Sequence, residues 1–312
     1  MKKKVLITGV AGFIGSNLAD RLLREGHMVL GLDTLAYGIP EQIPKGVELH
    51  KADIRSRDIY PLFNDVDFVF HLAAKNCIPD CQADPVETSD INITGTANVF
   101  EAARLANVKK VIYAESAALY EKINKFPTPE DEIAPETFYG ISKLCNHYFA
   151  KAYQQFYSLK TVGLRYFNVY GPRQNYRRTI PPVASAFIIK LLKGEQPIIF
   201  GDGTKRYDFI HVDDINDFHL LCMKDSRVDN FVFNLGTGKN YSILELYEIV
   251  AKIMGSNLKP VCKPAPEGGS EMSVADIRRA KEVGWSPKTN LEDGLRGMVD
   301  YVKTEFKKGN IK

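Results

Sequence analysis

The chain has 312 residues, of which 45% are hydrophobic and 25% are charged. These proportions are typical of a soluble globular protein with one large domain or two closely packed ones. The formal net charge is only +3, so the composition gives no reason to expect binding to nucleic acid or to a membrane surface.

The cysteines and the apolar segments both predict a cytoplasmic protein. The five cysteines show neither CxxC spacing nor paired histidines, so we expect no disulfide framework and no metal site. The N-terminal stretch MKKKVLITGVAGFIG is interrupted by glycines and continues as an amphipathic pattern, unlike a secretory signal peptide. No apolar run approaches the roughly 18 residues that a membrane-spanning helix needs.

Short apolar segments alternate with helical patterns through the first half of the chain. The segments at 16–26 and 95–107 have the apolar spacing of helices. Strand-like segments occupy residues 4–9, 27–33, 47–53, 67–74, 109–115 and 159–167. This alternation predicts an α/β fold with a doubly wound, Rossmann-like parallel sheet. The first segment, KVLIT, is apolar almost throughout, as expected of a strand that helices cover on both faces.

The turn after the first strand carries the strongest local signal. In ITGVAGFIGSNLADRL the glycines fall at Gly9, Gly12 and Gly15, a GxxGxxG spacing that differs from the GxGxxG dinucleotide fingerprint. Glycines let the backbone turn sharply and approach a pyrophosphate, and a helix N-terminus attracts negative charge. We interpret this segment as a dinucleotide site, the alternative being an ordinary glycine-rich turn.

Asp33 ends the second strand segment, where a carboxylate can accept hydrogen bonds from the adenine-ribose hydroxyls of a dinucleotide. A carboxylate at this place would repel a 2′-phosphate, so the sequence predicts NAD rather than NADP. The alternative is a solvated aspartate at the end of a strand.

Ser116, Tyr139 and Lys143 form the candidate catalytic set. Tyr139 and Lys143 are four residues apart and share one face if their segment is helical. A phenol with a pKa of about 10 is a poor base at neutral pH, but a nearby ammonium and the positive nicotinamide ring of NAD would lower that pKa. The alternatives are a serine that caps a turn and a tyrosine–lysine pair on a helix surface.

The alternation breaks down after about residue 170. The chain there contains the proline- and glycine-rich pieces YGPRQ, TIPPV, GEQPIIFGDGT and KPAPEGGS. We therefore expect a smaller, mostly C-terminal and irregular part built against the sheet.

Several motifs carry a resemblance to a known family. They are TGVAGFIG, ADI at 52–54, HLAA at 71–74, NITGTANVFEAAR, FYGISK, RYFNVYGPRQ and GDGTKRYDFIHVDD, and they occur in family order from residue 5 to about 300. With them the chain resembles the extended short-chain dehydrogenases/reductases, and within these the NAD-dependent nucleotide-sugar epimerase/dehydratase group, in particular the relatives of UDP-glucose 4-epimerase. The resemblance implies an NAD cofactor, a nucleotide-sugar substrate with UDP favoured, and a homodimer formed through the helices at 95–106 and 138–157.

The resemblance also implies the domain division and the roles of individual residues. The NAD-binding domain would comprise residues 1–168 and about 207–249, and the substrate-binding part about 169–206 and 250–312. Catalysis would fall to Ser116, Tyr139 and Lys143. The NAD site would consist of Gly9, Gly12, Phe13, Ile14, Gly15, Asp33, Asp53, Ile54, Leu72, Ala73, Ala74, Tyr139, Lys143 and Tyr166. The substrate site would consist of Ser116, Asn168, Arg173, Arg206, Tyr207 and Ser273.

The implied reaction is inversion at C4 of the hexose. Ser116 would hydrogen-bond the reacting hydroxyl, Tyr139 would remove its proton, and hydride would pass to NAD and return to the other face of a 4-keto sugar. Sugar dehydratases of this family carry an acidic pair after the serine, but this chain has Ala117 and Ala118, which cannot transfer protons. Strand alternation points the nearest acid, Glu115, to the opposite face. The remaining alternatives are a dehydratase or ketoreductase of the same fold, and a non-catalytic dinucleotide sensor or scaffold.

Two departures from the family concern the substrate diphosphate. Tyr207 stands where the epimerases often have a diphosphate-binding arginine, and Pro266 and Glu267 stand about where a second arginine is usual. Bidentate guanidinium contacts are not replaced by these side chains. Ser273 lies near a position that bounds the hexose pocket, where a small residue leaves room for an N-acetyl group. The candidates to compensate for the missing arginines are Arg173, Arg177, Arg178 and Arg206.

Overall fold

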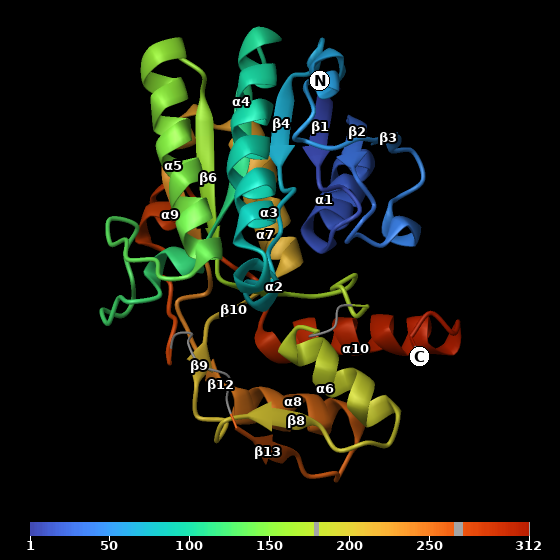
Figure 1. Ribbon diagram of the computed structural model, residues 1–312. Helices are drawn as coiled ribbons and strands as arrows, with labels where there is room; N and C mark the ends of the chain where they lie inside the picture. Colours follow the sequence, from blue (N-terminus) through green and yellow to red (C-terminus); the bar gives the residue numbers. More distant parts are fainter. Residues whose placement is uncertain (178–180, 265–270, 312) are drawn as a thin grey trace.

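The computed structural model describes residues 1–177, 181–264 and 271–311, which form a large sheet part and a smaller part below it in Figure 1. The large part contains a seven-stranded sheet in the order β11-β6-β5-β4-β1-β2-β3, and every neighbouring pair is parallel. The strands are β1 (Lys4–Thr8), β2 (Met28–Asp33), β3 (Glu48–Lys51), β4 (Phe68–His71), β5 (Lys110–Ser116), β6 (Thr161–Tyr166) and β11 (Val232–Leu235). The predicted doubly wound parallel sheet is confirmed, although β11 was not predicted as a strand.

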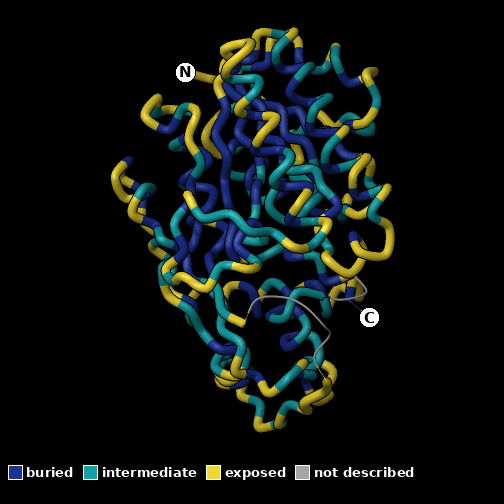
Figure 2. The backbone as a smooth tube through the Cα atoms, turned by 60° about the vertical axis from the view of Figure 1, so that its left-hand side comes forward, coloured by how far each residue is buried: buried dark blue, intermediate teal, exposed yellow. Residues whose placement is uncertain are grey.

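Helices cover both faces of the sheet. Strand β1 shows why: Val5 and Ile7 join the core on the α1 and α7 side, while Leu6 between them joins the core on the α4 and α5 side. Figure 2 shows the buried backbone concentrated in the centre of this part. One face carries α1 (Phe13–Arg24) and α7 (Val212–Lys224), and the other carries α4 (Gly95–Leu105) and α5 (Phe138–Tyr157), with α2 (Ile78–Ala83) and α3 (Pro85–Ser89) against α5.

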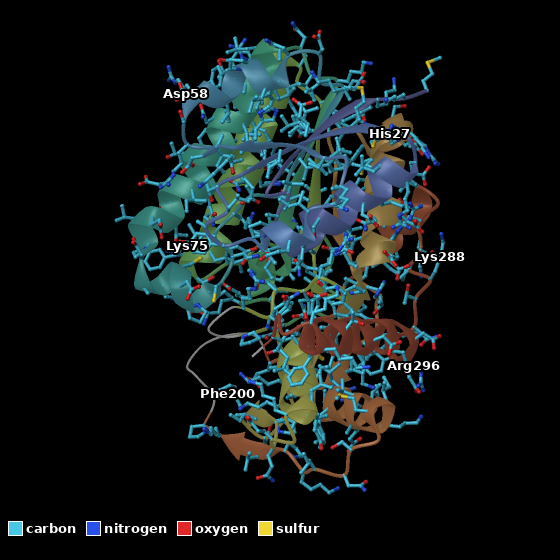
Figure 3. All side chains as sticks on the ribbon, turned by 90° about the vertical axis from the view of Figure 1, so that its right-hand side faces the viewer. His27, Asp58, Lys75, Phe200, Lys288 and Arg296 are labelled. Atoms are coloured by element: carbon cyan, nitrogen blue, oxygen red, sulfur yellow. The ribbon has the colours of Figure 1, made fainter. Side chains whose placement is uncertain are left out.

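The smaller part has a core of its own, built where three helices meet. These helices are α6 (Val183–Leu192), α8 (Ile243–Met254) and α10 (Leu291–Lys307). Three strand pairs extend it: β8 (Ile198–Phe200) with β13 (Val261–Lys263), β9 (Arg206–Tyr207) with β12 (Tyr241–Ser242), and β7 (Asn168–Tyr170) with β10 (Phe209–His211). Phe200 and Arg296 mark this part in Figure 3, where Lys75 lies in the sheet part above them. The domain boundaries given above stay a prediction.

Trp285 joins the C-terminal segment to the sheet part. It follows the short helix α9 (Arg278–Glu282) and is 4% exposed. Its indole packs edge-on against Phe218 of α7, with ring centroids 5.5 Å apart, and its Nε1 donates a 3.0 Å hydrogen bond to the carbonyl oxygen of Asp214. Among the described residues, we find no helix with the length and apolar character required to cross a bilayer.

Candidate active site

Several of the predicted cofactor and catalytic residues lie at the carboxyl edge of the sheet. Asp33, Ser116 and Tyr166 are the last residues of β2, β5 and β6, and the glycine turn directly follows β1. Because all strands of this sheet are parallel, these ends lie along one edge, which is the place where α/β sheets bind ligands. The smaller part lies next to this edge in Figure 1.

The glycine turn is too crowded for side chains. Gly9 has a φ of +77°, and a Cβ there would lie 2.7 Å from the backbone nitrogen of Ala73. A Cβ on Gly15 would lie 2.2 Å from the carbonyl oxygen of Gly9, so α1 packs directly on the turn. Gly12 is the N-cap of α1 and offers no side chain to the helix N-terminus. The backbone N–H groups at this terminus are therefore suited to an anion such as a pyrophosphate.

Asp33 is held by the same turn. Its Oδ2 accepts a 2.9 Å hydrogen bond from the backbone N–H of Ala11, and its Oδ1 accepts one of 2.8 Å from the N–H of Leu35. A carboxylate has about four acceptor positions, so each oxygen retains capacity for a ribose hydroxyl.

The other predicted cofactor residues lie farther along the same edge. The Asp53 carboxylate is held by the Arg55 side chain, with Nε 3.0 Å from Oδ1, and this hydrogen bond lowers the pKa of Asp53. Ile54 is buried against Gly95, where a Cβ would lie 2.6 Å from the Ile54 side chain. Leu72–Ala74 follow β4 and are half-buried.

Ser116 begins a short 3₁₀ turn over Ala117–Tyr120. Its Oγ accepts a 3.1 Å hydrogen bond from the N–H of Ala118, so the serine does cap a turn. A hydroxyl has two acceptor positions and one donor hydrogen, and the cap uses only one acceptor position. The capping contact and a hydrogen bond to a substrate hydroxyl are therefore compatible.

Tyr139 and Lys143 lie in the first two turns of α5. The Lys143 Nζ lies 5.8 Å from the centre of the Tyr139 ring and donates a 2.9 Å hydrogen bond to the carbonyl oxygen of Ala114. Burial lowers the pKa of Lys143 to about 8, although the negative charge of Glu115 opposes that shift. At neutral pH the ammonium is still mostly charged, and a cation at this place favours the phenolate form of Tyr139.

Glu115 influences Lys143 through its charge, but its hydrogen bonds are made to other residues. Its carboxylate accepts a 2.7 Å hydrogen bond from the Tyr113 hydroxyl, lies 3.0 Å from the Nδ1 of His147, and pairs with the Nε of Arg165 at 2.7 Å. Burial by itself would raise the pKa of Glu115, but the hydrogen bond with His147 and the charge of Arg165 lower it to about 2. Glu115 is thus an ionised carboxylate whose oxygens are held by Tyr113, His147 and Arg165.

Tyr166 lies beside Ser116 in the sheet register and forms a buried pair with His219 of α7. The Tyr166 hydroxyl lies 2.7 Å from the His219 Nε2, and the His219 Nδ1 lies 3.3 Å from the Oδ1 of Asn216. Burial lowers the pKa of His219 to about 3 and raises the pKa of Tyr166. A neutral His219 therefore accepts the phenol hydrogen and fixes the orientation of Tyr166.

The predicted substrate residues fall into two groups. Strand β9 carries Arg206 and Tyr207, and the N–H of Ser273 donates a 2.9 Å hydrogen bond to the carbonyl oxygen of Arg206. Asn168 joins this group because its N–H donates to the carbonyl oxygen of Asp208 at 3.0 Å. Arg173 lies apart, donating a 2.8 Å hydrogen bond to the carbonyl oxygen of Ser16 in α1. Arg178, Pro266 and Glu267 lie outside the described residues.

Arg206 is already paired within the smaller part. Its Nε donates a 2.9 Å hydrogen bond to the Oδ1 of Asn240, and its Nη2 lies 2.9 Å from the Oε2 of Glu245. A diphosphate would have to compete with these partners for the guanidinium.

Asp208 was missed by the sequence analysis, yet it organises the loops around Ser273. It is fully buried, and its carboxylate accepts hydrogen bonds from the N–H groups of Thr237 at 2.7 Å, Gly238 at 2.9 Å and Ala275 at 3.1 Å. The available signal was a single acid between the aromatic residues of RYDF. His219 was also missed, since a polar residue in α7 does not by itself reveal its partner.

Comparisons with known proteins show the family and the fold of the chain. A family model described as the NAD dependent epimerase/dehydratase family matches residues 5–236. The chain is 35% identical to the UDP-glucose 4-epimerase of Mycolicibacterium smegmatis, with 97% of this chain and 99% of the relative covered. The crystal structure of a UDP-glucose 4-epimerase from Thermotoga maritima, with UDP-glucose, has a TM-score of 0.94 at 35% identity and covers 97% of this chain and 99% of that one. A UDP-N-acetylglucosamine 4-epimerase from Methanobrevibacter ruminantium, in complex with UDP-N-acetylmuramic acid, has a TM-score of 0.94 at 32% identity and covers 98% of this chain and all of the other.

Proposed function

Since the chain belongs to the NAD-dependent epimerase/dehydratase family, we propose that it is an NAD-dependent 4-epimerase of a UDP-hexose. The observation that carries the proposal is the convergence of Ser116 and the Tyr139–Lys143 pair on the same sheet edge as the glycine turn. The chain matches relatives named as UDP-sugar 4-epimerases over nearly their whole length, and these names support the substrate class.

The residues at the sheet edge fit NAD. The turn leaves no room for a Cβ at Gly9 or Gly15, α1 presents a bare N-terminus, and Asp33 has acceptor positions left for ribose hydroxyls. Gly9, Gly12, Gly15 and Asp33 would hold the adenosine and pyrophosphate portions. When bound, NAD supplies the acceptor and donor of a hydride at C4 of the sugar.

The protein's own side chains handle the proton. Tyr139 takes the proton of the C4 hydroxyl and later gives it back to the inverted hydroxyl, so its phenolate must be accessible at neutral pH. The Lys143 ammonium stabilises that phenolate. Ser116 donates its hydroxyl hydrogen to the sugar oxygen and so aligns the sugar hydroxyl for proton transfer.

The residues after Ser116 favour inversion over dehydration. Ala117 and Ala118 have no group that can move a proton at C5 or C6. Glu115 is bound to Arg165 and its pKa is lowered to about 2, so it is not available as a general acid. The 4-keto intermediate is therefore reduced back rather than losing water.

The small side chain of Ser273 supports the acceptance of an N-acetylhexosamine as well as a hexose. The N–H of Ser273 donates a hydrogen bond to the carbonyl oxygen of Arg206, so Ser273 lies beside two other residues proposed to bind the substrate, Arg206 and Tyr207. A relative named as a UDP-N-acetylglucosamine 4-epimerase is among the matching structures. The cytoplasmic location predicted from the sequence stays a prediction.

A homodimer through α4 and α5 is the assembly that the surface supports. These two helices expose several large apolar side chains, and a patch of such side chains marks an interaction surface. They are Leu105, Phe138, Ile141, Tyr148, Phe149, Phe156 and Tyr157. Light scattering at micromolar concentration should give twice the mass of one chain, and a monomer would exclude this assembly.

Product analysis tests the reaction. Incubation with UDP-glucose or UDP-N-acetylglucosamine should give only the C4 epimer by NMR. Substrate deuterated at C4 should yield inverted product that retains the label, and unlabelled substrate in heavy water should gain no deuterium at C5. Label at C5 or a 4-keto-6-deoxy product would refute the proposed reaction.

A further inference from the structure

Ser116 and Tyr139 lie on different elements, and the chain between them must hold them in one geometry. Ser116 ends β5 and leads into the turn Ala117–Tyr120, while Tyr139 is the second residue of α5. Proton transfer requires reacting atoms aligned within a fraction of an ångström. The contacts between the Ala117–Tyr120 turn and the start of α5 therefore bear on catalysis.

Glu121, the residue directly after this turn, is hydrogen-bonded to the start of α5. Its Oε2 accepts hydrogen bonds from the backbone N–H groups of Glu136 at 2.7 Å and Thr137 at 2.8 Å, and its Oε1 accepts one from the Thr137 hydroxyl at 2.8 Å. Thr137 is the N-cap of α5, and its Oγ1 accepts the N–H of Gly140 at 3.0 Å. One carboxylate thus fixes both the backbone before the helix and the capping side chain.

The turn and the start of α5 also make a close contact at Gly140. A Cβ on Gly140 would lie 2.9 Å from the carbonyl oxygen of Ala118 and 3.1 Å from the Oε2 of Glu121. The helix backbone next to Tyr139 thus lies directly against the turn that begins at Ser116. Glu121 maintains this close contact because its carboxylate, on the turn side, accepts all three hydrogen bonds from donors at the start of α5.

We infer that Glu121 is a positioning residue that sets the distance and orientation between Ser116 and Tyr139, an inference that rests on the proposed roles of those two residues. Glu121 acts through Thr137 and the start of α5, so it is not a catalytic residue. Its loss should disturb the chemical step more than the binding of substrate or NAD.

The test compares Glu121→Ala with Glu121→Gln in the full-length enzyme. Glu121→Ala removes all three hydrogen bonds, so kcat should fall by about tenfold or more while KM changes by less than about threefold. Glu121→Gln keeps an amide oxygen for the two backbone N–H groups and should restore kcat to within about threefold of wild type. The matched control is Glu132→Ala, which removes an exposed ion pair with Lys125 in the same connecting segment and should leave kcat unchanged.

A second pair of variants covers the case in which Glu121→Ala does not fold. Thr137→Val removes both hydrogen bonds of Oγ1, the one to Glu121 and the one from the N–H of Gly140, and should lower kcat. Thr137→Ser keeps both hydrogen bonds and should retain the wild-type kcat. Rates are expressed per NAD-loaded, folded site. If the substitutions only reduce the amount of folded enzyme, kcat per site will equal that of the wild type, and this result would overturn the inference. Normal kcat in Glu121→Ala would overturn it as well. If the wild-type enzyme inverts its substrate and Tyr139→Phe does not, the proposed function stands whatever Glu121 does.

Discussion

Lys143 donates a hydrogen bond of 2.9 Å from its Nζ to the carbonyl oxygen of Ala114, two residues before Ser116 on β5. The helix that carries Tyr139 and Lys143 is thereby tied to the strand that carries Ser116. The lysine is 3% exposed, and burial lowers its pKa to about 8 from 10.5. The same burial that orients the ammonium makes the charged form costly.

Lys143→Met should therefore stabilise the NAD-free protein while it abolishes activity. The depressed pKa corresponds to about 3 kcal/mol of penalty at pH 7, and the lost hydrogen bond offsets about 1 kcal/mol of the gain. The unfolded state binds more protons between pH 8 and 10.5, so the penalty is complete below pH 8 and fades as the pH rises through this window. Urea unfolding at pH 7 and pH 10 measures the gain, with the exposed Lys151→Met on the same helix as the control. Equal or lower stability of Lys143→Met at pH 7 would contradict the expected burial penalty.

Tyr139→Phe should reduce turnover by at least about a hundredfold, as expected for the loss of a general base. The variant should still bind NAD, because the glycine turn and Asp33 are unchanged. Turnover by NMR and cofactor content by absorbance check the two statements. Tyr148→Phe, an exposed position nine residues along the same helix, should keep full activity; near-normal turnover in Tyr139→Phe would remove the phenol from the mechanism.

The wild-type protein should bind NAD more tightly than NADP, and Asp33→Asn should narrow that preference. A carboxylate close to a 2′-phosphate is unfavourable by about 1 kcal/mol or more, so NADP affinity should rise by about tenfold in the variant. Titration calorimetry with both dinucleotides measures the ratio. The asparagine side chain keeps an oxygen that can accept the hydrogen bond from the Ala11 N–H. If the variant binds neither dinucleotide, the negative charge of Asp33 is needed to keep the glycine turn in its binding conformation.

Glu115→Gln should destabilise the protein by about 3 kcal/mol or more, because it leaves the buried Arg165 guanidinium without its negative partner. The folded pKa of Glu115 is lowered from 4.5 to about 2, so its contribution is complete above pH 4.5 and is lost as the pH falls toward 2. The difference in unfolding free energy from wild type should therefore shrink below pH 4.5. Glu292→Gln, which breaks an exposed pair with Arg296, should cost less than about 1 kcal/mol. Similar small effects of both variants would show that the buried pair adds no stability.

Much of the sheet and its cofactor edge could be predicted from local pattern. A strand buried on both faces, such as β1, must be apolar along its length, and a turn without room for a Cβ must contain glycine. Strand β11 was not predicted because its four residues include Asn234, which interrupts the apolar run. Asn234 is buried and hydrogen-bonds the carbonyl oxygen of Thr128 at 2.9 Å, a partner that the local sequence cannot reveal.

The substrate side was less predictable because its contacts join residues far apart in the chain. Asp208 binds the N–H of Ala275, and Arg173 reaches back to Ser16 in α1. Such pairs leave no periodic signal in the sequence. Arg206 illustrates the consequence: the sequence offered it as a diphosphate ligand, and the structure shows it paired with Glu245.

Trp285 gives the molecule a built-in optical probe. It is the only tryptophan of the chain, so all indole fluorescence comes from the point where the C-terminal segment packs on α7. Its burial should give an emission that is blue-shifted relative to the unfolded, water-exposed indole. A red shift that precedes the loss of helical circular dichroism during unfolding would report that this segment leaves α7 before the sheet part opens.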